Sequence, residues 1–188
     1  MTRYQGVVEI EYRHFTLAHP ETDTTSVTTR SHLVDLGAGF VTVHTGIANG
    51  PVLLSVDLVE RRPESNIARW DLVTECSIDV QFPLSVITAT GNVPDDFAEM
   101  SHISAGTYGL RVHCQRQAEN ADATTDTVSE KYLLTFWPSP LFPLLQVKST
   151  EASETGSPAE SAPADPPLHV GTADATVQLR GPVIMPER

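Results

Sequence analysis

The sequence predicts an all-β fold, an antiparallel β-sandwich of about seven to eight strands. Apolar and polar residues alternate strictly in three segments, residues 70–81, 108–116 and 132–137. A period of two with one apolar face is typical of a half-buried antiparallel strand. No segment shows a sustained helical period, and short turns separate the strands, which favours a sandwich or a barrel.

The first predicted strand, residues 6–19, contains a break in its alternation. Its apolar set changes parity after Tyr12. One extra residue near Arg13 and His14 would produce this shift, so we predict a β-bulge there.

The other strands are predicted from β-branched and apolar runs bounded by Gly, Pro and Asn. The nearly continuous apolar run at residues 52–59 is expected at the centre of a sheet. Segments rich in Thr, Asp or charge are predicted to be loops. The remaining predicted strands are 33–36 (a short strand or a turn), 40–43, 84–90 and 97–103, and the predicted loops include 20–30, 60–66 and 117–129.

A single folded domain followed by a polar tail is the predicted organisation. A chain of 188 residues fits one domain that is stable without metals or disulfides. Residues 149–169 consist almost entirely of Ser, Glu, Ala, Pro, Thr, Gly and Asp, which cannot bury enough apolar surface to fold. We therefore predict a sandwich domain at 1–148, a disordered acidic linker at 149–169 and a C-terminal tail at 170–188. The tail is either disordered or holds one docking strand.

The charge balance bears on the class of partner. Acidic residues outnumber basic ones by 24 to 12, which gives a formal net charge of −12. Direct binding of nucleic acid relies on clustered Lys and Arg, so this balance argues against it. A basic protein partner is favoured instead, although net acidity also serves to keep a protein soluble.

Cysteine usage and the N-terminal sequence predict a cytoplasmic location. Cys76 and Cys114 are the two cysteines, each on the apolar side of a predicted strand, so buried thiols are expected, with a disulfide as the alternative. No apolar signal segment opens the chain, and no run approaches the roughly 20 apolar residues that span a bilayer. No membrane association is predicted.

The polar face of the strand at 70–81 is the predicted partner-binding surface. Asp71, Glu75 and Asp79 share this face at spacings of four residues. Neighbours in such a row lie roughly 13 Å apart at 3.3 Å per residue, which is too far for acid–base pairing. The row suits a basic partner, and the alternative is an ordinary solvated sheet face.

Three further residues complete the predicted surface. Glu9 and Glu11 occupy the polar side of the first strand, and Trp137, beside Pro138, is the aromatic residue expected to be partly exposed. Most of the other aromatic side chains of the strands lie on the inward side and are expected in the core, and the basic residues that would accompany a nucleic-acid stacking platform are missing. These core residues are Trp70, Tyr108, Tyr132 and Phe136.

No motif for catalysis or for cofactor binding is present. The seven histidines form no HxH or HExxH pattern, and the chain has no GxSxG, Walker or GxGxxG motif. We predict no enzyme activity, no cofactor and no metal. The alternative, an enzyme that uses clustered histidines, requires a bound metal.

Three segments resemble the competence protein J family: IEYRHFTL at 10–17, AGTYGLRV at 105–112 and EKYLLTF at 130–136. The resemblance covers roughly residues 6–138. Members of that family are small and β-rich, and the name-giving member inhibits a DNA-entry nuclease. The resemblance implies an inhibitor or an immunity-like protein, but it transfers no inhibitory residue. This chain differs in its Trp-Pro stop at Pro138, its linker and its longer tail.

Two functions are predicted, both without catalysis. The first is a protein-binding module that masks a basic nuclease or toxin. The second is a structural or assembly subunit whose C-terminal tail tethers a neighbouring protein. The sequence leaves a homo-oligomer open.

Overall fold

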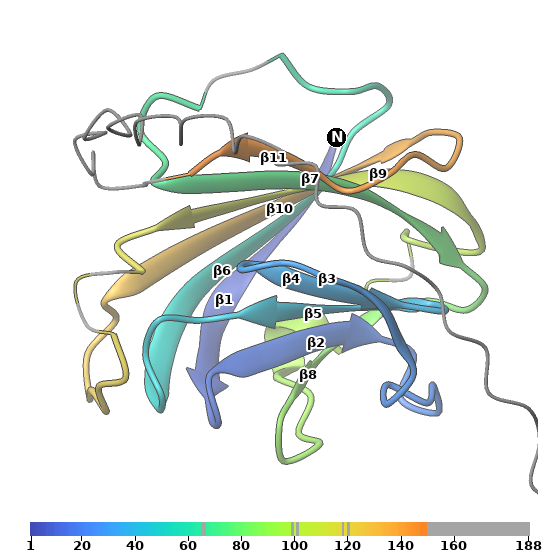
Figure 1. Ribbon diagram of the computed structural model, residues 1–188. Helices are drawn as coiled ribbons and strands as arrows, with labels where there is room; N and C mark the ends of the chain where they lie inside the picture. Colours follow the sequence, from blue (N-terminus) through green and yellow to red (C-terminus); the bar gives the residue numbers. More distant parts are fainter. Residues whose placement is uncertain (65–66, 99, 101, 118, 120, 150–188) are drawn as a thin grey trace, which may run out of the picture. The chain divides into compact units, whose positions relative to one another are not determined.

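Two β-sheets packed face to face form the folded part of the chain, which confirms the predicted all-β sandwich (Figure 1). The computed structural model describes residues 1–64, 67–98, 100, 102–117, 119 and 121–149. These residues lie within one compact unit, Met1–Ala152. The predicted linker and tail lie outside the described residues, apart from Ser149.

The larger sheet has six strands, and one of its neighbouring pairs is parallel. Its strands, in spatial order, are β1 (Thr2–Ile10), β6 (Gly50–Leu58), β10 (Glu130–Pro138), β9 (Gly106–Gln115), β7 (Leu72–Val80) and β11 (Leu145–Lys148). The sequence predicts antiparallel strands throughout, but the pair β6 and β10 is parallel. The chain returns to β10 only after it has formed β7, β8 and β9, and such a long crossover permits parallel pairing.

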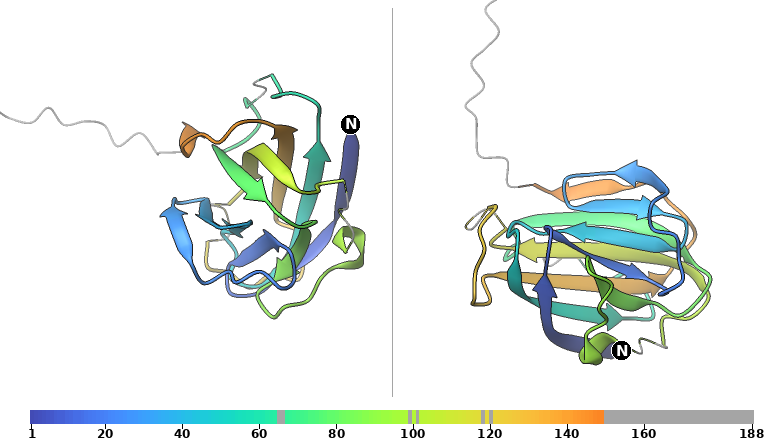
Figure 2. Two further views of the ribbon diagram at one scale, coloured as in Figure 1. Left: turned by 90° about the vertical axis from the view of Figure 1, so that its right-hand side faces the viewer. Right: turned by 90° about the horizontal axis from the view of Figure 1, so that it is seen from below.

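The smaller sheet has five antiparallel strands. They are β3 (Val27–Arg30), β4 (Val34–Gly37), β5 (Phe40–His44), β2 (His14–Ala18) and β8 (Ser85–Thr88). The described residues thus form eleven strands, more than the seven or eight predicted. The excess comes from short strands at sheet edges, β3 and β11, and from the division of the first predicted strand. Figure 2 shows the two layers from other sides.

The shift in parity near Arg13 marks a turn and not the predicted bulge. An isolated antiparallel bridge joins Glu11 to His14 across the two residues between them. These two residues, Tyr12 and Arg13, have φ angles of 55° and 66°, as in a type I′ hairpin turn. The turn carries the chain from β1 in the larger sheet to β2 in the smaller one, so it forms a corner between the two layers.

The predicted strand at 97–103 is also absent from the described residues of that segment. A short 3-10 helix, Asp95–Phe97, precedes a turn, and Met100 makes a single bridge to Leu84. Phe97, Met100 and Ile103 are fully buried, so the apolar residues read as a strand are side chains that pack into the core.

The inner faces of the two sheets form one apolar core. Tyr108, Tyr132 and Phe136 are buried in it, as predicted, and Phe15 of the smaller sheet meets Tyr132 edge to face at 5.7 Å. Both cysteines are free and buried, and burial raises the pKa of each thiol to about 12. The expectation of buried thiols is therefore confirmed. Among the described residues no helix is long and apolar enough to cross a membrane.

Candidate binding site at the open end of the sandwich

Glu75, predicted to be exposed on the partner-binding face, is buried. The pairing of β7 with β9 places it directly opposite Arg111, and the two side chains are 1% and 2% exposed. Arg111 Nε donates to Glu75 Oε1 at 2.5 Å, and Arg62 Nη2 donates to Oε2 at 2.5 Å. The Arg111 guanidinium also donates to the carbonyl oxygens of Pro63 and Glu64, so the loop after β6 covers this part of the sheet. The prediction for Glu75 is wrong because the sheet register supplies an arginine partner.

The Glu75–Arg111 pair belongs to a row that crosses five strands. Thr135 of β10 lies opposite Arg111, Asp57 of β6 lies beside Thr135, and Arg3 of β1 lies opposite Asp57. Arg3 Nε and Nη2 donate to the two carboxylate oxygens of Asp57 at 2.6 and 2.7 Å. Opposite charges therefore meet within the face, which leaves it without the anionic row that the sequence predicts.

Trp137 is also buried, at 3% exposed, although it was expected to be partly exposed. Its ring lies over Gly109, its partner on β9, where an added Cβ would come within 2.3 Å of the indole. The Phe142 ring stacks on the indole, with the ring centroids 6.4 Å apart. Ser77 holds Phe142 by accepting its N–H at 2.7 Å and donating to its carbonyl at 2.8 Å. The chain after β10 thus folds back and covers the indole.

The sequence predicts Trp70 on the inward side of its strand. In the structure its ring is instead buried against the outer face of the larger sheet. Its ring lies 5.1 Å from that of His113, which projects from the face shared by Arg111. His113 Nδ1 lies 3.0 Å from the Leu133 carbonyl. Burial, together with the nearby charge of Arg111, lowers the pKa of His113 to about 4, so the ring is neutral at pH 7.

The remaining predicted contact residues lie at two ends of the sandwich. Asp79 is exposed at one end of β7, whereas Asp71, at the other end, is half-buried and accepts the Arg116 N–H at 2.6 Å. Glu9 is exposed and Glu11 is half-buried. The strand registers place Glu9, Glu11 and Asp71 toward the same end, which is also the end of the β1–β2 turn. The structure therefore brings Glu9, Glu11 and Asp71 toward one end and separates them from the other predicted contact residues. Those are Glu75, Asp79 and Trp137.

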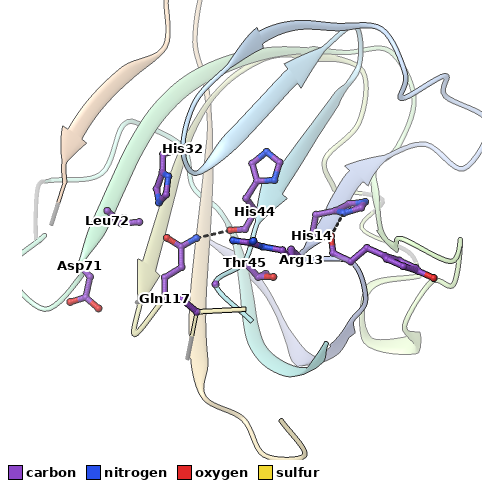
Figure 3. A pocket seen from close by; sticks show the side chains of 11 residues that line it. Arg13, His14, His32, His44, Thr45, Asp71, Leu72 and Gln117 are labelled. Atoms are coloured by element: carbon purple, nitrogen blue, oxygen red, sulfur yellow. Dashed lines mark hydrogen bonds between the residues drawn. The ribbon is translucent and has the colours of Figure 1, made fainter. Parts of the chain in front are cut away.

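A pocket of about 550 Å³ opens at this end of the sandwich, a size that suits a small ligand or a partner's side chain (Figure 3). Both sheets contribute to its walls. In Figure 3 the Arg13 side chain extends into the pocket toward Gln117 and Thr45. The lining includes Tyr12, Arg13 and His14 of the turn, His32 and His44 of the smaller sheet's end, Asp71 and Leu72 of the β7 end, and Gln117 after β9.

Three of the seven histidines line the pocket, although no special role was predicted for any histidine from the sequence. His14 Nδ1 lies 2.9 Å from the Tyr12 carbonyl oxygen, so this nitrogen carries the proton and donates. His44 Nε2 lies 3.4 Å from a carboxylate oxygen of Asp35. Figure 3 shows the rings of His14, His32 and His44 apart from one another. In the part of the chain that the structure describes, no three metal-binding side chains are grouped to hold an ion.

Backbone strain gathers around this pocket. Four non-glycine residues have a left-handed conformation among the residues with described structure: Tyr12, Arg13, Arg116 and Asp122. The first two line the pocket, and the other two directly neighbour lining residues in the chain. Left-handed non-glycine residues cost free energy and concentrate at functional sites. All four border one pocket, which makes this end the candidate site.

The strained turn is held by hydrogen bonds to the segment between β5 and β6. Arg13 N–H donates to the Ala48 carbonyl at 3.1 Å, and Thr45 N–H donates to the Arg13 carbonyl at 2.8 Å. The same segment holds the loop after β9, because Asp122 N–H donates to the Gly46 carbonyl at 2.8 Å. The Arg13 guanidinium forms an ion pair with the Asp122 carboxylate, which connects the two loops directly.

The fully buried Glu130 anchors the segment between β5 and β6. Its carboxylate accepts the N–H of Gly46 at 3.1 Å and the N–H of Ile47 at 2.7 Å. Tyr132 donates its hydroxyl to the same carboxylate at 2.6 Å, and burial raises the pKa of Tyr132, which keeps the phenol protonated. Sequence reasoning missed Glu130, although an acidic residue two positions before the predicted strand at 132–137, in phase with its apolar side, is a signal that could have found it.

The comparisons with known proteins add little to this geometry. No protein-family model matches the chain, and no curated protein matches it. Among solved structures, the chain is similar to one named "Crocagin biosynthetic gene J", with a TM-score of 0.47 and 11% identity over 74% of this chain and 98% of that chain. The resemblance to the competence protein J family stays a prediction.

Proposed function

We propose that this chain is a non-enzymatic, cytoplasmic protein-binding module whose partner is a basic protein such as a nuclease or a toxin. The proposed binding surface is the open end of the sandwich, namely the β1–β2 turn, the segment between β5 and β6, and the loop after β9. The observation that carries the proposal is the concentration of left-handed, non-glycine residues around the pocket at this end. A fold that needed only stability would place Gly, Asn or Asp at such positions, and three of the four residues, Tyr12, Arg13 and Arg116, are none of these.

Charge supports a basic partner at this end. The loop at 117–129 contains Glu119, Asp122 and Asp126, all exposed; Glu119 pairs with Arg116 and Asp122 with Arg13, whereas Asp126 makes no ion pair among the described residues. Glu11 and Asp71, two of the predicted contact residues, lie toward the same end. Clustered charge of one sign steers an oppositely charged protein to the surface and makes its association sensitive to salt. The resemblance to a family whose name-giving member inhibits a nuclease supports the same class of partner.

The test is affinity capture from a native lysate with the full-length chain as bait. The eluted proteins are identified by mass spectrometry and purified, and their affinity is measured between about 50 and 500 mM NaCl, a range over which screening length falls severalfold. We expect a basic protein whose affinity falls as salt rises. A set of retained proteins with no basic member, or an affinity that ignores salt, contradicts the proposal.

The second candidate, an assembly subunit, is favoured by the end of the described chain. Leu141 and Leu145 are 64% and 48% exposed, and β11 is an edge strand directly before the predicted linker to the tail. Exposed sheet edges and apolar side chains are typical of surfaces that join other proteins. Removal of all residues after Lys148 distinguishes the two candidates. Capture of a basic partner should survive this deletion if the loops bind it, whereas assembly through the tail should fail.

A further inference from the structure

We propose that the turn formed by Tyr12 and Arg13 is the anchor of the partner interface, with the Tyr12 ring serving as the platform for a Lys or Arg side chain of the basic partner. This inference rests on the proposed function, because it requires a protein partner at the open end. It goes further by naming the contact residue and the chemistry that recognises it.

The first argument concerns the backbone of the turn. A type I′ turn needs a positive φ at both central residues, and Asn-Gly is the pair that meets this need with little strain. Here Tyr12 and Arg13 hold φ angles of 55° and 66°. The Arg13 guanidinium pairs with Asp122, but the Tyr12 side chain makes no hydrogen bond, ion pair or ring contact among the described residues, so local stability does not explain the presence of Tyr12. A functional role of the side chain itself does explain why it is there.

The second argument concerns the exposure and rigidity of Tyr12. Its side chain is 74% exposed at the tip of the turn. The backbone beneath it is fixed, because Arg13 exchanges two hydrogen bonds with the segment that Glu130 anchors, and the Tyr12 N–H lies 3.4 Å from Asn49 Oδ1. A large ring on a rigid backbone loses little conformational entropy on binding, which is why Tyr is enriched at energetic centres of interfaces.

The third argument concerns charge beside the ring. Arg13 turns into the pocket and pairs with Asp122, so the guanidinium next to Tyr12 is neutralised within the chain. In the loop that contributes Asp122, Glu119 pairs with Arg116, whereas the exposed Asp126 makes no ion pair among the described residues, and neither does Glu11, which directly precedes Tyr12. A cation of the partner therefore meets a negative surround and an accessible aromatic face. Lys and Arg are attracted to such faces, more strongly as water is excluded.

Four variants of the full-length chain test the anchor. The double variant Tyr12→Asn/Arg13→Gly installs the relaxed turn and removes both side chains, and Arg13→Gly alone removes the guanidinium. Tyr12→Phe keeps the ring. Phe82→Ser, which removes an aromatic side chain 59% exposed beyond the opposite end of β7, is the matched control. The probe is the purified basic protein that the wild-type chain retains from lysate.

We expect the double variant to melt about 2 to 8 °C higher than wild type, because it relieves backbone strain in a domain of this size. We also expect its affinity for the partner to fall at least about 30-fold, the loss typical of a removed hot spot. Tyr12→Phe and Phe82→Ser should keep the affinity within about threefold, since both leave the proposed platform in place.

Each contrary result overturns a different step. An unchanged or lower Tm of the double variant removes the strain argument. Wild-type affinity in the double variant refutes the anchor but leaves the proposed function standing. A loss in Arg13→Gly as large as that in the double variant assigns recognition to the guanidinium, and hence to an acidic group of the partner, which refutes the Tyr12 platform. Failure of the wild-type chain to retain a basic protein overturns the inference and the proposed function together.

Discussion

Glu130→Gln is the variant that most directly tests how the candidate site is held in place. The wild-type carboxylate accepts three hydrogen bonds, from the Gly46 and Ile47 amides and from the Tyr132 hydroxyl. Glutamine has nearly the same shape but keeps one acceptor oxygen and presents an NH2 donor in place of the other. Whichever way the amide turns, a donor then faces a donor inside the fold.

The magnitude follows from burial and bond type. Glu130 is 0% exposed, so water cannot replace a lost bond. Hydrogen bonds to charged groups contribute about 1.5 to 3 kcal/mol each, and an unsatisfied buried donor costs a further ~1 to 3 kcal/mol. The uncharged amide is cheaper to bury than a carboxylate, which offsets part of this loss. We expect the free energy of unfolding to fall by about 2 to 4 kcal/mol, and Tm to fall by about 4 to 16 °C.

Urea unfolding followed by tryptophan fluorescence measures this loss, and hydrogen exchange locates it. Amide protection should fall at Gly46 and Ile47, and also at Arg13, whose N–H donates to the segment that Glu130 anchors. Glu9→Gln makes the same chemical change at an exposed position and should stay within about 0.5 kcal/mol of wild type. If Glu130→Gln unfolds like Glu9→Gln, or if protection at Arg13 is unchanged, Glu130 does not position the turn.

Three further predictions concern the sheets. Removal of one partner from a buried ion pair leaves an orphaned charge, so Glu75→Ala should lower the free energy of unfolding by about 3 to 5 kcal/mol in urea titrations, while the exposed Asp79→Ala stays within about 0.5 kcal/mol. The pKa of His113 is lowered to about 4 from 6.5, so its stabilising contribution is complete above pH 6.5 and is lost as pH falls toward 4. His113→Phe should therefore lessen the loss of stability between pH 7 and 4 by roughly 2 to 3 kcal/mol, and an identical pH profile would contradict the assignment. Cys76 and Cys114, buried with raised pKa values, should react with a thiol reagent at the rate of unfolding, and rapid labelling in native buffer would show that they are accessible.

The parts of the fold that the sequence predicts well are those where one strand face is apolar over several alternating residues. The strands at 70–81, 108–116 and 132–137 appear as β7, β9 and β10 within a few residues of their predicted bounds. Short polar strands such as β3, with half-buried Val27 beside exposed neighbours, carry no such signal. Their formation depends on hydrogen bonds to a neighbouring strand, which local pattern does not encode.

The errors about the predicted contact residues Glu75 and Trp137 share one physical cause, the effect of partners far away in the sequence. Period two assigned Glu75 to the polar face correctly, but only the register with β9 shows that Arg111 lies opposite it. In the same way, Trp137 beside a proline gave no sign that Phe142 returns to cover it. The turn at Tyr12 and Arg13 was missed because neither residue is Gly, Asn or Asp, the usual mark of a type I′ turn. The proposed function rests on that missing mark.

The two central variants separate stability from binding because Glu130 and Tyr12 act on the same turn from opposite sides. Glu130 holds the turn from within, so its loss lowers stability and should weaken binding by loosening the platform. Tyr12 and Arg13 form the strained tip, so their replacement by Asn and Gly raises stability and should still weaken binding. If stability alone governed binding, the two variants would change affinity in opposite directions. A common loss of affinity with opposite shifts in Tm therefore requires that the turn itself makes contact with the partner.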